Sequence, residues 1–271
     1  MNKHRTAFPT LALEVVRISD VVLEVLDARF IKETRNLELE REVIAAGKKL
    51  VFVVNKVDLV DVRALKQELE LGNMKPYVLF SCTKGIGRAK LRECIKIEVK
   101  RFKVLHAKAH VGIIGYPNTG KSSLINFLAG RKVSSTSAAA GHTKGIQRIR
   151  FNKDILILDT PGVIAEGTAA QQTGEGMHKH TKIGVRMYDQ TKEPDFVISG
   201  LMQEHPGIFE SYYSIAAEGD AEILLETFGR QHNLLVKGGA IDTVRAARLV
   251  LKDWQEGLIR PKKKVSKSCP S

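Results

Sequence analysis

The sequence GYPNTGKS at residues 115–122 most limits how this chain can fold. It fits the pattern G-x4-G-K-[ST], in which glycines let successive backbone N–H groups wrap phosphate oxygens. Such a loop needs a strand before it and a helix after it, whose N-terminus adds partial positive charge. The run HVGII precedes the loop and the helical pattern SSLINFLAG follows it. These flanks favour a phosphate-binding strand–loop–helix unit over a chance match.

Short apolar runs recur along the first two-thirds of the chain, separated by polar segments with a helical period. We expect strands at residues 21–26, 50–54, 77–80, 111–114 and 155–158, and helices at residues 33–46, 61–71 and 84–102. Runs that are apolar and β-branched throughout are typical of parallel strands covered on both faces. The alternation predicts an α/β fold with a doubly wound, mostly parallel sheet and ligand sites at the carboxyl ends of its strands.

The strand runs stop after about residue 175, and the rest of the chain has helical character. Its last part carries an apolar stripe at three- and four-residue spacing: Val244, Ala247, Leu251, Trp254 and Leu258. We therefore predict a nucleotide-binding domain over residues 1–178, a small C-terminal helical domain over residues 179–260 and a basic tail over residues 261–271.

The charge balance suggests a polyanionic partner. The chain has 43 Lys and Arg against 30 Asp and Glu, a formal net charge of +13. Nucleic acid or an anionic membrane would fit this surplus, although a solvated lysine-rich surface gives the same count. Residues 84–108 contain nine Lys or Arg, and residues 260–267 add five more. Salt-sensitive contact with RNA phosphates is a natural use of such segments.

Cysteine content and hydropathy bear on the compartment. Three widely spaced cysteines without a CxxC pair indicate neither a disulfide framework nor a zinc site. No signal peptide is evident, and no apolar run reaches the roughly 18 residues that cross a bilayer. We expect a cytoplasmic, monomeric protein that does not enter a membrane.

The phosphate loop assigns roles to several residues. Lys121 would reach the β- and γ-phosphates, and the Ser122 hydroxyl would bind Mg²⁺. Asp159 ends the run ILIL and could hold Mg²⁺ through water, while Gly162 lets its backbone N–H approach the γ-phosphate. A strand-ending turn is the other explanation of DTPG. The nucleotide-binding set expected here is Asn118, Thr119, Gly120, Lys121, Ser122, Ser123 and Gly162.

A polar loop at residues 141–145 lies between these two motifs. Thr143 is the candidate that completes Mg²⁺ coordination when a nucleoside triphosphate is bound, with the hydroxyls of residues 134–136 as competitors. Together with Lys121 and Gly162, it forms the expected catalytic group. The histidines at 142, 178 and 180 are more simply solvated side chains than metal ligands.

Base selection is expected from Asn55-Lys56-Val57-Asp58, directly after the run LVFVV. The Asp58 carboxylate can accept hydrogens from guanine N1–H and the amino group, a pair that adenine does not offer. Lys56 would pack its stem along the base, and Asn55 would tie loops together. Ser81 and Cys82 follow the next strand, where a backbone N–H can meet the guanine carbonyl.

These are the five GTPase motifs, but they occur in the order four, five, one, two, three. The chain resembles the circularly permuted GTPases, specifically the YlqF/RbgA-like family of ribosome-assembly GTPases. Asp27-Ala28-Arg29 and the run at residues 237–248 add to the resemblance, which extends to about residue 260. The chain departs from relatives that have Pro-Gly-His near the N-terminus, since only His4 is present here.

The resemblance implies a GTP-binding, GTP-hydrolysing switch protein that uses Mg²⁺. It further implies an assembly factor for the large ribosomal subunit or its precursor, acting through rRNA contact. Val163 stands where many GTPases have a water-orienting glutamine, so we expect slow intrinsic hydrolysis that ribosomal particles stimulate. Asn118 resembles the asparagine that supports K⁺ in potassium-activated GTPases, which makes K⁺ a candidate second cation.

Two alternatives remain open on the sequence. An RNA-binding scaffold could bind GTP and hydrolyse it negligibly, which Val163 would permit. A membrane-associated GTPase could place the basic tail on anionic lipid, but the chain shows no amphipathic anchor or lipidation motif.

Overall fold

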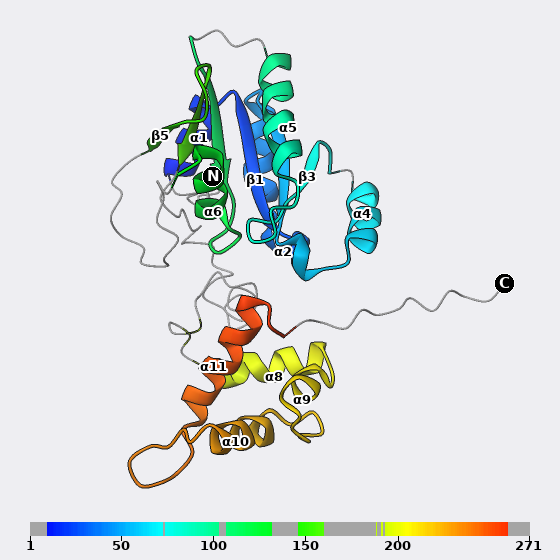
Figure 1. Cartoon of the computed structure of the whole chain (residues 1–271), viewed down its shortest axis with the longest axis vertical. Coiled ribbons are helices and arrows are strands. Elements are labelled where there is room, and N and C mark those ends of the chain that lie inside the picture. Colours follow the sequence, from blue (N-terminus) through cyan, green and yellow to red (C-terminus); the bar gives the residue numbers. More distant parts are fainter. Residues whose placement is uncertain are drawn as a thin grey trace, which may run out of the picture. The chain divides into compact units, whose positions relative to one another are not determined.

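The computed structural model describes residues 10–72, 74–102, 107–131, 146–159, 188, 191 and 193–259. The chain divides into two compact units, residues 1–173 and 174–271, which are described separately below (Figure 1). The limits at residues 178 and 260 that the sequence suggests fall outside the described residues and stay predictions.

Unit 1 is built on one six-stranded sheet with the order β3-β2-β1-β4-β6-β5. The strands are β1 (Val21–Asp27), β2 (Lys49–Asn55), β3 (Tyr77–Leu79), β4 (Ala109–Ile114), β5 (Gln147–Arg150) and β6 (Ile155–Asp159). All neighbouring pairs are parallel except β5 with β6. The predicted doubly wound, mostly parallel sheet is therefore confirmed, with an antiparallel strand at one edge.

The chain reverses its direction of travel across the sheet between β3 and β4. It first moves outward through β1, β2 and β3, and then returns so that β4 pairs with β1, with Val21 opposite Val111. A reversal of this kind in an open α/β sheet leaves a crevice at the carboxyl ends of the two central strands, where ligands bind. The phosphate loop follows β4 directly, so the fold places it at this switch point.

Helices cover both faces of the sheet because alternate strand residues point to opposite sides. Leu23 and Val53 pack with α5 (Arg88–Arg101) and α6 (Lys121–Ala129) on one face. On the other, Val22 packs with α1 (Thr10–Ile18) and α3 (Leu37–Ala45). Phe52 packs there with α4 (Val62–Leu71).

Unit 2 is a small helical bundle. Its helices are α8 (Pro194–Glu204), α9 (Ile208–Tyr213), α10 (Ala221–Gln231) and α11 (Thr243–Glu256). Trp254 is 1% exposed and stacks on Phe209 with ring centroids 5.6 Å apart. Gly229 lets α10 approach the chain before α11, since a Cβ there would collide with the Ile241 side chain. The predicted C-terminal helical domain is thus present in the described residues.

The structure corrects four details of the sequence-based prediction. The segment 33–46 is not one helix: α2 (Ile31–Thr34) ends before Asn36, whose side chain caps α3. The helix expected from residue 84 begins at Arg88, after Gly87 at φ 76°. Strand β5 was not expected, because its four residues include a single apolar one, Ile149.

The fourth correction concerns the apolar stripe of α11. Ala247, Leu251 and Trp254 are buried as expected. Val244 and Leu258 are 43% and 51% exposed, so they do not belong to the buried face. Ala246 and Val250 belong to it instead, and Gly257 ends the helix before Leu258.

Candidate functional site

The polar motifs of unit 1 come together at the carboxyl edge of the sheet. Asp27 ends β1, Asn55 ends β2 and Asp159 ends β6. Ser81 follows β3 after one residue, and the phosphate loop follows β4. Because parallel strands end at the same edge, motifs that lie far apart in the sequence, such as Asp27 and Asp159, are brought to one edge in the order that the sheet dictates.

The phosphate loop has the backbone shape that anion binding requires. Gly115, Asn118 and Gly120 have φ values of 140°, 59° and 101°. At Gly115 a Cβ would lie 2.5 Å from the Val25 carbonyl oxygen, so only glycine fits against β1. Alternation of left- and right-handed residues turns successive N–H groups toward one point, which makes an anion-binding concavity. Gly120 then begins α6, whose N-terminus adds to the positive potential.

Lys121 is the cation of this loop. Its ammonium Nζ donates to the Tyr116 carbonyl oxygen at 2.6 Å, and the Thr119 hydroxyl donates to the same oxygen at 2.8 Å. Burial lowers the pKa of Lys121 to about 8, against the opposing effect of the Asp159 charge. A buried ammonium gains most from a multiply charged anion, so this side chain suits the phosphates of a nucleotide.

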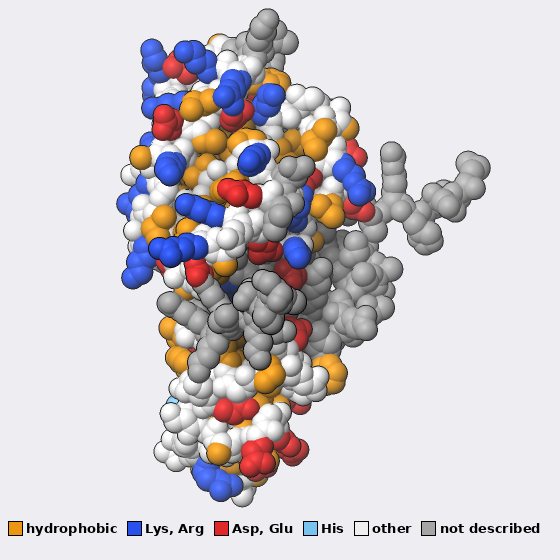
Figure 2. Space-filling model, turned by 90° about the vertical axis from the view of Figure 1, so that its right-hand side faces the viewer, with side chains coloured by type: hydrophobic (Ala, Val, Ile, Leu, Met, Phe, Trp, Pro, Cys, Tyr) orange, Lys and Arg blue, Asp and Glu red, His pale blue; other side chains and the backbone are white. Residues whose placement is uncertain are grey.

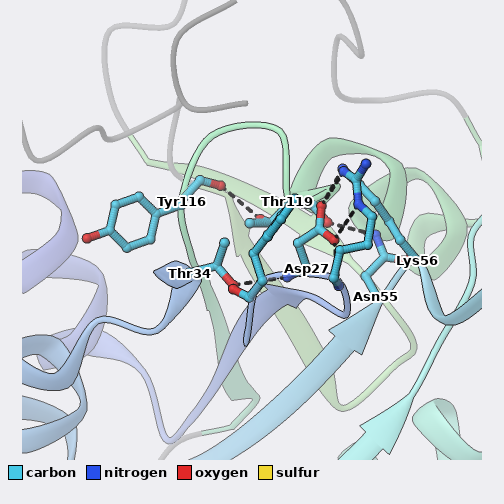
Figure 3. Close-up of polar contacts among 8 residues, drawn as sticks. Asp27, Thr34, Asn55, Lys56, Tyr116 and Thr119 are labelled. Atoms are coloured by element: carbon cyan, nitrogen blue, oxygen red, sulfur yellow. Dashed lines mark hydrogen bonds and ion pairs between the residues drawn. The ribbon is translucent and has the colours of Figure 1, made fainter. Parts of the chain in front are cut away.

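Asn55 connects the two halves of the site. Its side-chain Nδ2 donates to the Thr119 carbonyl oxygen at 2.8 Å across 64 residues of sequence (Figure 3). At Gly120 a Cβ would collide with this same Asn55 amide. Asn55 therefore links the turn after β2, which the sequence suggests for base selection, to the loop after β4.

Lys56 has a specific anion beside it. Its φ is 63°, the left-handed region that non-glycine residues seldom adopt, and Nζ lies 2.8 Å from Asp27 Oδ2. Arg29 holds the same carboxylate from Nε at 3.0 Å and from Nη2 at 2.8 Å. Burial opposes the charge of Asp27, but the Arg29 hydrogen bond and the Lys56 charge outweigh it and lower the pKa of Asp27 to about 2.

The remaining guanine-motif residues surround Asp58. Asp58 and Val57 lie in η1 (Val57–Leu59), a 3₁₀ turn directly after Lys56. The Val57 N–H donates to the Phe80 carbonyl at 3.3 Å and its side chain is buried, so Val57 anchors this turn to the residue that follows β3. The Thr83 hydroxyl reaches Asp58 Oδ2 at 3.3 Å and Ser81 Oγ at 3.1 Å. The fourth and fifth motifs thus form one continuous surface.

Cys82 follows Ser81 in this surface. Burial raises the pKa of the Cys82 thiol to about 11, so the thiol is neutral at physiological pH. Its backbone N–H, rather than its sulfur, is the group that could meet a base carbonyl.

The metal and switch residues are described only in part. Ser122 is the second residue of α6, and Asp159 lies close enough to Lys121 to influence its pKa. A hydroxyl and a carboxylate beside a phosphate loop are oxygen donors of the kind Mg²⁺ takes. Thr143 and Gly162 lie outside the described residues, as do Val163, His4 and the histidines at 142, 178 and 180. Among the described residues no cluster of three His, Cys, Asp or Glu side chains could hold a metal by itself.

Sequence reasoning missed two features of the site. The Tyr116 carbonyl, which accepts from both Thr119 and Lys121, carries no sequence signal because any residue has a carbonyl. The Asp27–Arg29–Lys56 network was detectable only as the tripeptide Asp-Ala-Arg after a strand, without a stated role. Its function depends on β1 and β2 being neighbours, with Asp27 opposite Asn55.

Comparison with known proteins agrees with this geometry. The 50S ribosome-binding GTPase family matches residues 110–207. The structure superposes on GNP-bound YlqF from Thermotoga maritima with a TM-score of 0.63 and 25% identity, covering 92% of this chain and 96% of that one. The chain thus has the fold of YlqF, a circularly permuted GTPase.

Proteins similar in sequence to this chain include archaeal and eukaryotic ones. An uncharacterised GTP-binding protein of Methanocaldococcus jannaschii is 36% identical over 90% of this chain and 64% of its own length. Nucleolar GTP-binding protein 2 of Yarrowia lipolytica is 33% identical over 91% of this chain and 48% of its own length. The chain thus spans about half to two-thirds of these curated relatives.

Proposed function

We propose that this chain binds GTP and GDP, hydrolyses GTP and acts as a nucleotide-dependent assembly factor of the large ribosomal subunit. The observation that carries the proposal is the hydrogen bond between Asn55 and the Thr119 carbonyl. This bond supports the proposal because it fixes the turn that we expect to read guanine beside the phosphate loop.

Each part of the site would have a defined task. The loop N–H groups and Lys121 bind the phosphates, while the Asp58 carboxylate accepts the hydrogens of guanine N1 and its amino group. Ser122 and Asp159, with Thr143, would hold Mg²⁺, which supplies positive charge against the phosphate oxygens. Gly162 would offer its backbone N–H to the γ-phosphate. These roles position charge and exclude a wrong base without any covalent step on the protein.

Hydrolysis is expected to be slow in the isolated protein. Val163 cannot orient a water molecule, so additional positive charge or an outside group must complete the site. K⁺ is the candidate cation, with Asn118 of the phosphate loop as its expected support. Equal turnover in K⁺ and Na⁺ buffers would rule out this part of the proposal.

The proposed partner is ribosomal RNA of the large subunit. The matching family is described as 50S ribosome-binding, and the relatives include a nucleolar GTP-binding protein. Residues 193–259 contain five Lys and Arg against eleven Asp and Glu, although the whole chain carries +13. Figure 2 shows Lys and Arg side chains spread over the larger unit and acidic side chains on the smaller one. We therefore propose that unit 1 and residues 260–267 make the contacts with RNA phosphates.

Helix α5 is the best-described basic segment. Lys90, Lys96 and Lys100 are exposed along it. Arg92 is engaged internally, since its guanidinium lies over the Phe127 ring at 5.1 Å and donates to the Phe127 carbonyl at 3.2 Å. The three lysines are thus the α5 side chains that we propose for RNA contact.

Turnover assays test the whole proposal. GTP hydrolysis is measured in K⁺ buffer with the protein alone, with large subunits and with small subunits. We expect stimulation by the large subunit only. Binding of GTP without turnover in any mixture, including one with immature large particles, would support an RNA-binding scaffold instead. No binding of guanine nucleotide would overturn the proposal.

A charge-reversal variant tests the RNA contact. Lys90→Glu/Lys96→Glu/Lys100→Glu is expected to weaken binding to large-subunit RNA and to lower the slope of log affinity against log salt by about 2–3, because each phosphate contact contributes close to one. Arg63→Glu/Lys66→Glu on α4, also exposed, is the control and should leave the slope nearly unchanged. Equal effects of the two variants would contradict a specific α5 surface.

The expected location is the cytoplasm or, by analogy with relatives whose names include the word nucleolar, the nucleolus. No helix among the described residues has the length and apolarity to span a bilayer. Imaging of a tagged chain together with large-subunit precursors distinguishes the two locations.

A further inference from the structure

We propose that Asp27 is a positioning residue of the guanine site: its carboxylate holds the Lys56 side chain in place and thereby raises the affinity for guanine nucleotides. The inference rests on the proposed function, because Lys56 belongs to the base-reading segment. It assigns a task to the tripeptide Asp27-Ala28-Arg29, which the nucleotide motifs do not use.

The contact between Asp27 and Lys56 joins two adjacent strand ends. Asp27 is the last residue of β1, and its register partner is Asn55, the last residue of β2. Lys56 follows Asn55, and its Nζ lies 2.8 Å from Asp27 Oδ2 (Figure 3). The Asp27 side chain is 1% exposed and that of Lys56 is 24% exposed. The anchor is therefore buried, while part of the anchored side chain stays open to a ligand.

The Asp27 carboxylate is itself held rigidly. Its Oδ1 accepts from the Arg29 backbone N–H and from Arg29 Nε, each at 3.0 Å. The Asp27 N–H donates to the Thr34 hydroxyl at 3.2 Å, and this hydroxyl donates to the Phe30 carbonyl at 2.7 Å. The neighbouring Ala28 N–H donates to the Asn55 carbonyl at 2.8 Å. Because the Asp27 carboxylate is already immobilised, it loses no further conformational entropy when the Lys56 ammonium pairs with it.

Lys56 needs such an anchor for two reasons. A lysine side chain has several rotatable bonds, and fixing one on binding costs free energy that a preorganised side chain has already lost. Burial also lowers the pKa of the Lys56 ammonium, which Asp27 opposes. The carboxylate therefore keeps Lys56 both charged and extended toward β1, so that its aliphatic stem can lie along a purine.

A purely structural ion pair would explain less of the geometry. Arg29 alone already gives Asp27 a bidentate guanidinium contact. The ion pair between Asp27 and Lys56 is therefore not needed to pair Arg29. What it does is fix the Lys56 side chain, which is the one long side chain of the base-reading turn. The left-handed backbone at Lys56 also supports a positioning role. Such a conformation costs free energy, and strained residues of this kind are concentrated at functional sites.

A double-mutant cycle tests the inference. Affinity for fluorescent GDP is measured for the wild type, Asp27→Asn, Lys56→Met and the double variant, alongside thermal unfolding. Asp27→Asn is expected to bind GDP about 10-fold more weakly. This factor corresponds to the free energy of immobilising one or two side chains, which the variant would have to spend when GDP binds. In the Lys56→Met background the same substitution should change the affinity by less than about 2-fold, because no ammonium remains to be positioned.

Two further variants separate positioning from folding. Asp27→Glu keeps a charge for Arg29 but displaces the carboxylate, so the variant should remain folded and bind GDP more weakly. In the Lys56→Met background the same substitution should no longer weaken GDP binding. Glu40→Gln removes the carboxylate that Arg35 contacts at 2.6 Å and 2.8 Å. This control should lower the unfolding midpoint without changing GDP affinity.

The outcomes distinguish the inference from the proposed function. If the wild type binds no guanine nucleotide, the proposed function fails. If the wild type binds GDP and the Asp27 variants bind equally well, or lose the same affinity with Lys56 and with Met at position 56, Asp27 has only a structural role and the inference is wrong.

Discussion

At the scale of single residues, Lys121 combines burial with a charge that the proposed ligand must neutralise. Its pKa of about 8 lies below the roughly 10.4 of an unfolded lysine. Between these two values the unfolded chain binds more protons than the folded one, so the Lys121 contribution to stability rises with pH across that window. A bound phosphate should reverse the shift by favouring the ammonium.

Nucleotide binding is therefore expected to take up protons above pH 8. Near pH 8.5, calorimetric GDP titrations in buffers of different ionisation enthalpy should show uptake of roughly half a proton or more per GDP, and affinity should fall as pH rises. At pH 7 the Lys121 contribution should be close to zero, because the ammonium is then charged in both states. The Cys82 thiol, with a pKa of about 11, should not contribute at pH 8.5. Equal uptake at both pH values would contradict a lowered Lys121 pKa.

Gly120→Ala should disconnect the base-reading turn from the phosphate loop. The added methyl would collide with the Asn55 amide and also strain a residue at φ 101°. We expect a loss of about 1–3 kcal/mol in the free energy of unfolding, together with markedly weaker GDP binding. Urea unfolding and fluorescent-GDP titration measure the two effects.

The matched control is Gly130→Ala. Gly130 has a similar left-handed backbone, at φ 69°, but a Cβ there meets no atom within 4 Å. It should cost only the backbone strain and leave nucleotide affinity intact. Similar GDP affinities for the two variants would show that the Asn55 contact is dispensable.

At the scale of elements, helix α11 shows how end signals and packing act together. The Asp242 side chain accepts from the Arg245 N–H at 2.9 Å and begins the helix, and Gly257 at φ 79° ends it. Between them a fully buried face that includes Trp254 packs into unit 2. The caps define the length of the helix, whereas packing selects the face that is buried.

Asp242→Ala should destabilise unit 2 by about 1 kcal/mol through loss of the N-cap. Trp254 is the single tryptophan of the chain and is buried beside Phe209, so its fluorescence during urea unfolding reports this unit. Glu226→Ala, at an exposed position inside α10, is the control and should change stability by less than about 0.5 kcal/mol. A control effect as large as that of Asp242→Ala would argue against capping as the cause.

At the scale of the whole molecule, the proposed base-reading motif follows β2 and the phosphate loop follows β4, so the two are far apart along the chain. All described site residues nevertheless belong to unit 1. Unit 2 has its own buried core and contributes none of them. A ligand that binds one unit stabilises that unit in proportion to the logarithm of its concentration.

GDP at about 100 times its Kd should therefore stabilise unit 1 by roughly 2.7 kcal/mol. We expect the unfolding midpoint measured by release of fluorescent GDP to rise as the GDP concentration is increased. The midpoint measured by Trp254 fluorescence should stay near its value without nucleotide. A parallel rise of both midpoints would show instead that the two units unfold as one cooperative body.

The sequence alone determined the local parts of this protein. The phosphate loop, the buried strands and the order of motifs are read from short patterns, because backbone conformation and hydrophobic periodicity depend on near neighbours. The same reasoning was wrong about the single helix at residues 33–46, which Asn36 divides, and it missed β5, whose one inward side chain leaves no period to detect.

Only the tertiary structure decided which side chains meet. Asn55 reaches Thr119 across 64 residues, and Asp27 reaches Lys56, because β1 lies between β2 and β4 with a particular register. The burial of Val250 in place of Val244 likewise depends on the helices around α11. Such contacts arise from strand order and packing between distant segments, so the motifs name the chemistry and the fold determines which groups perform it together.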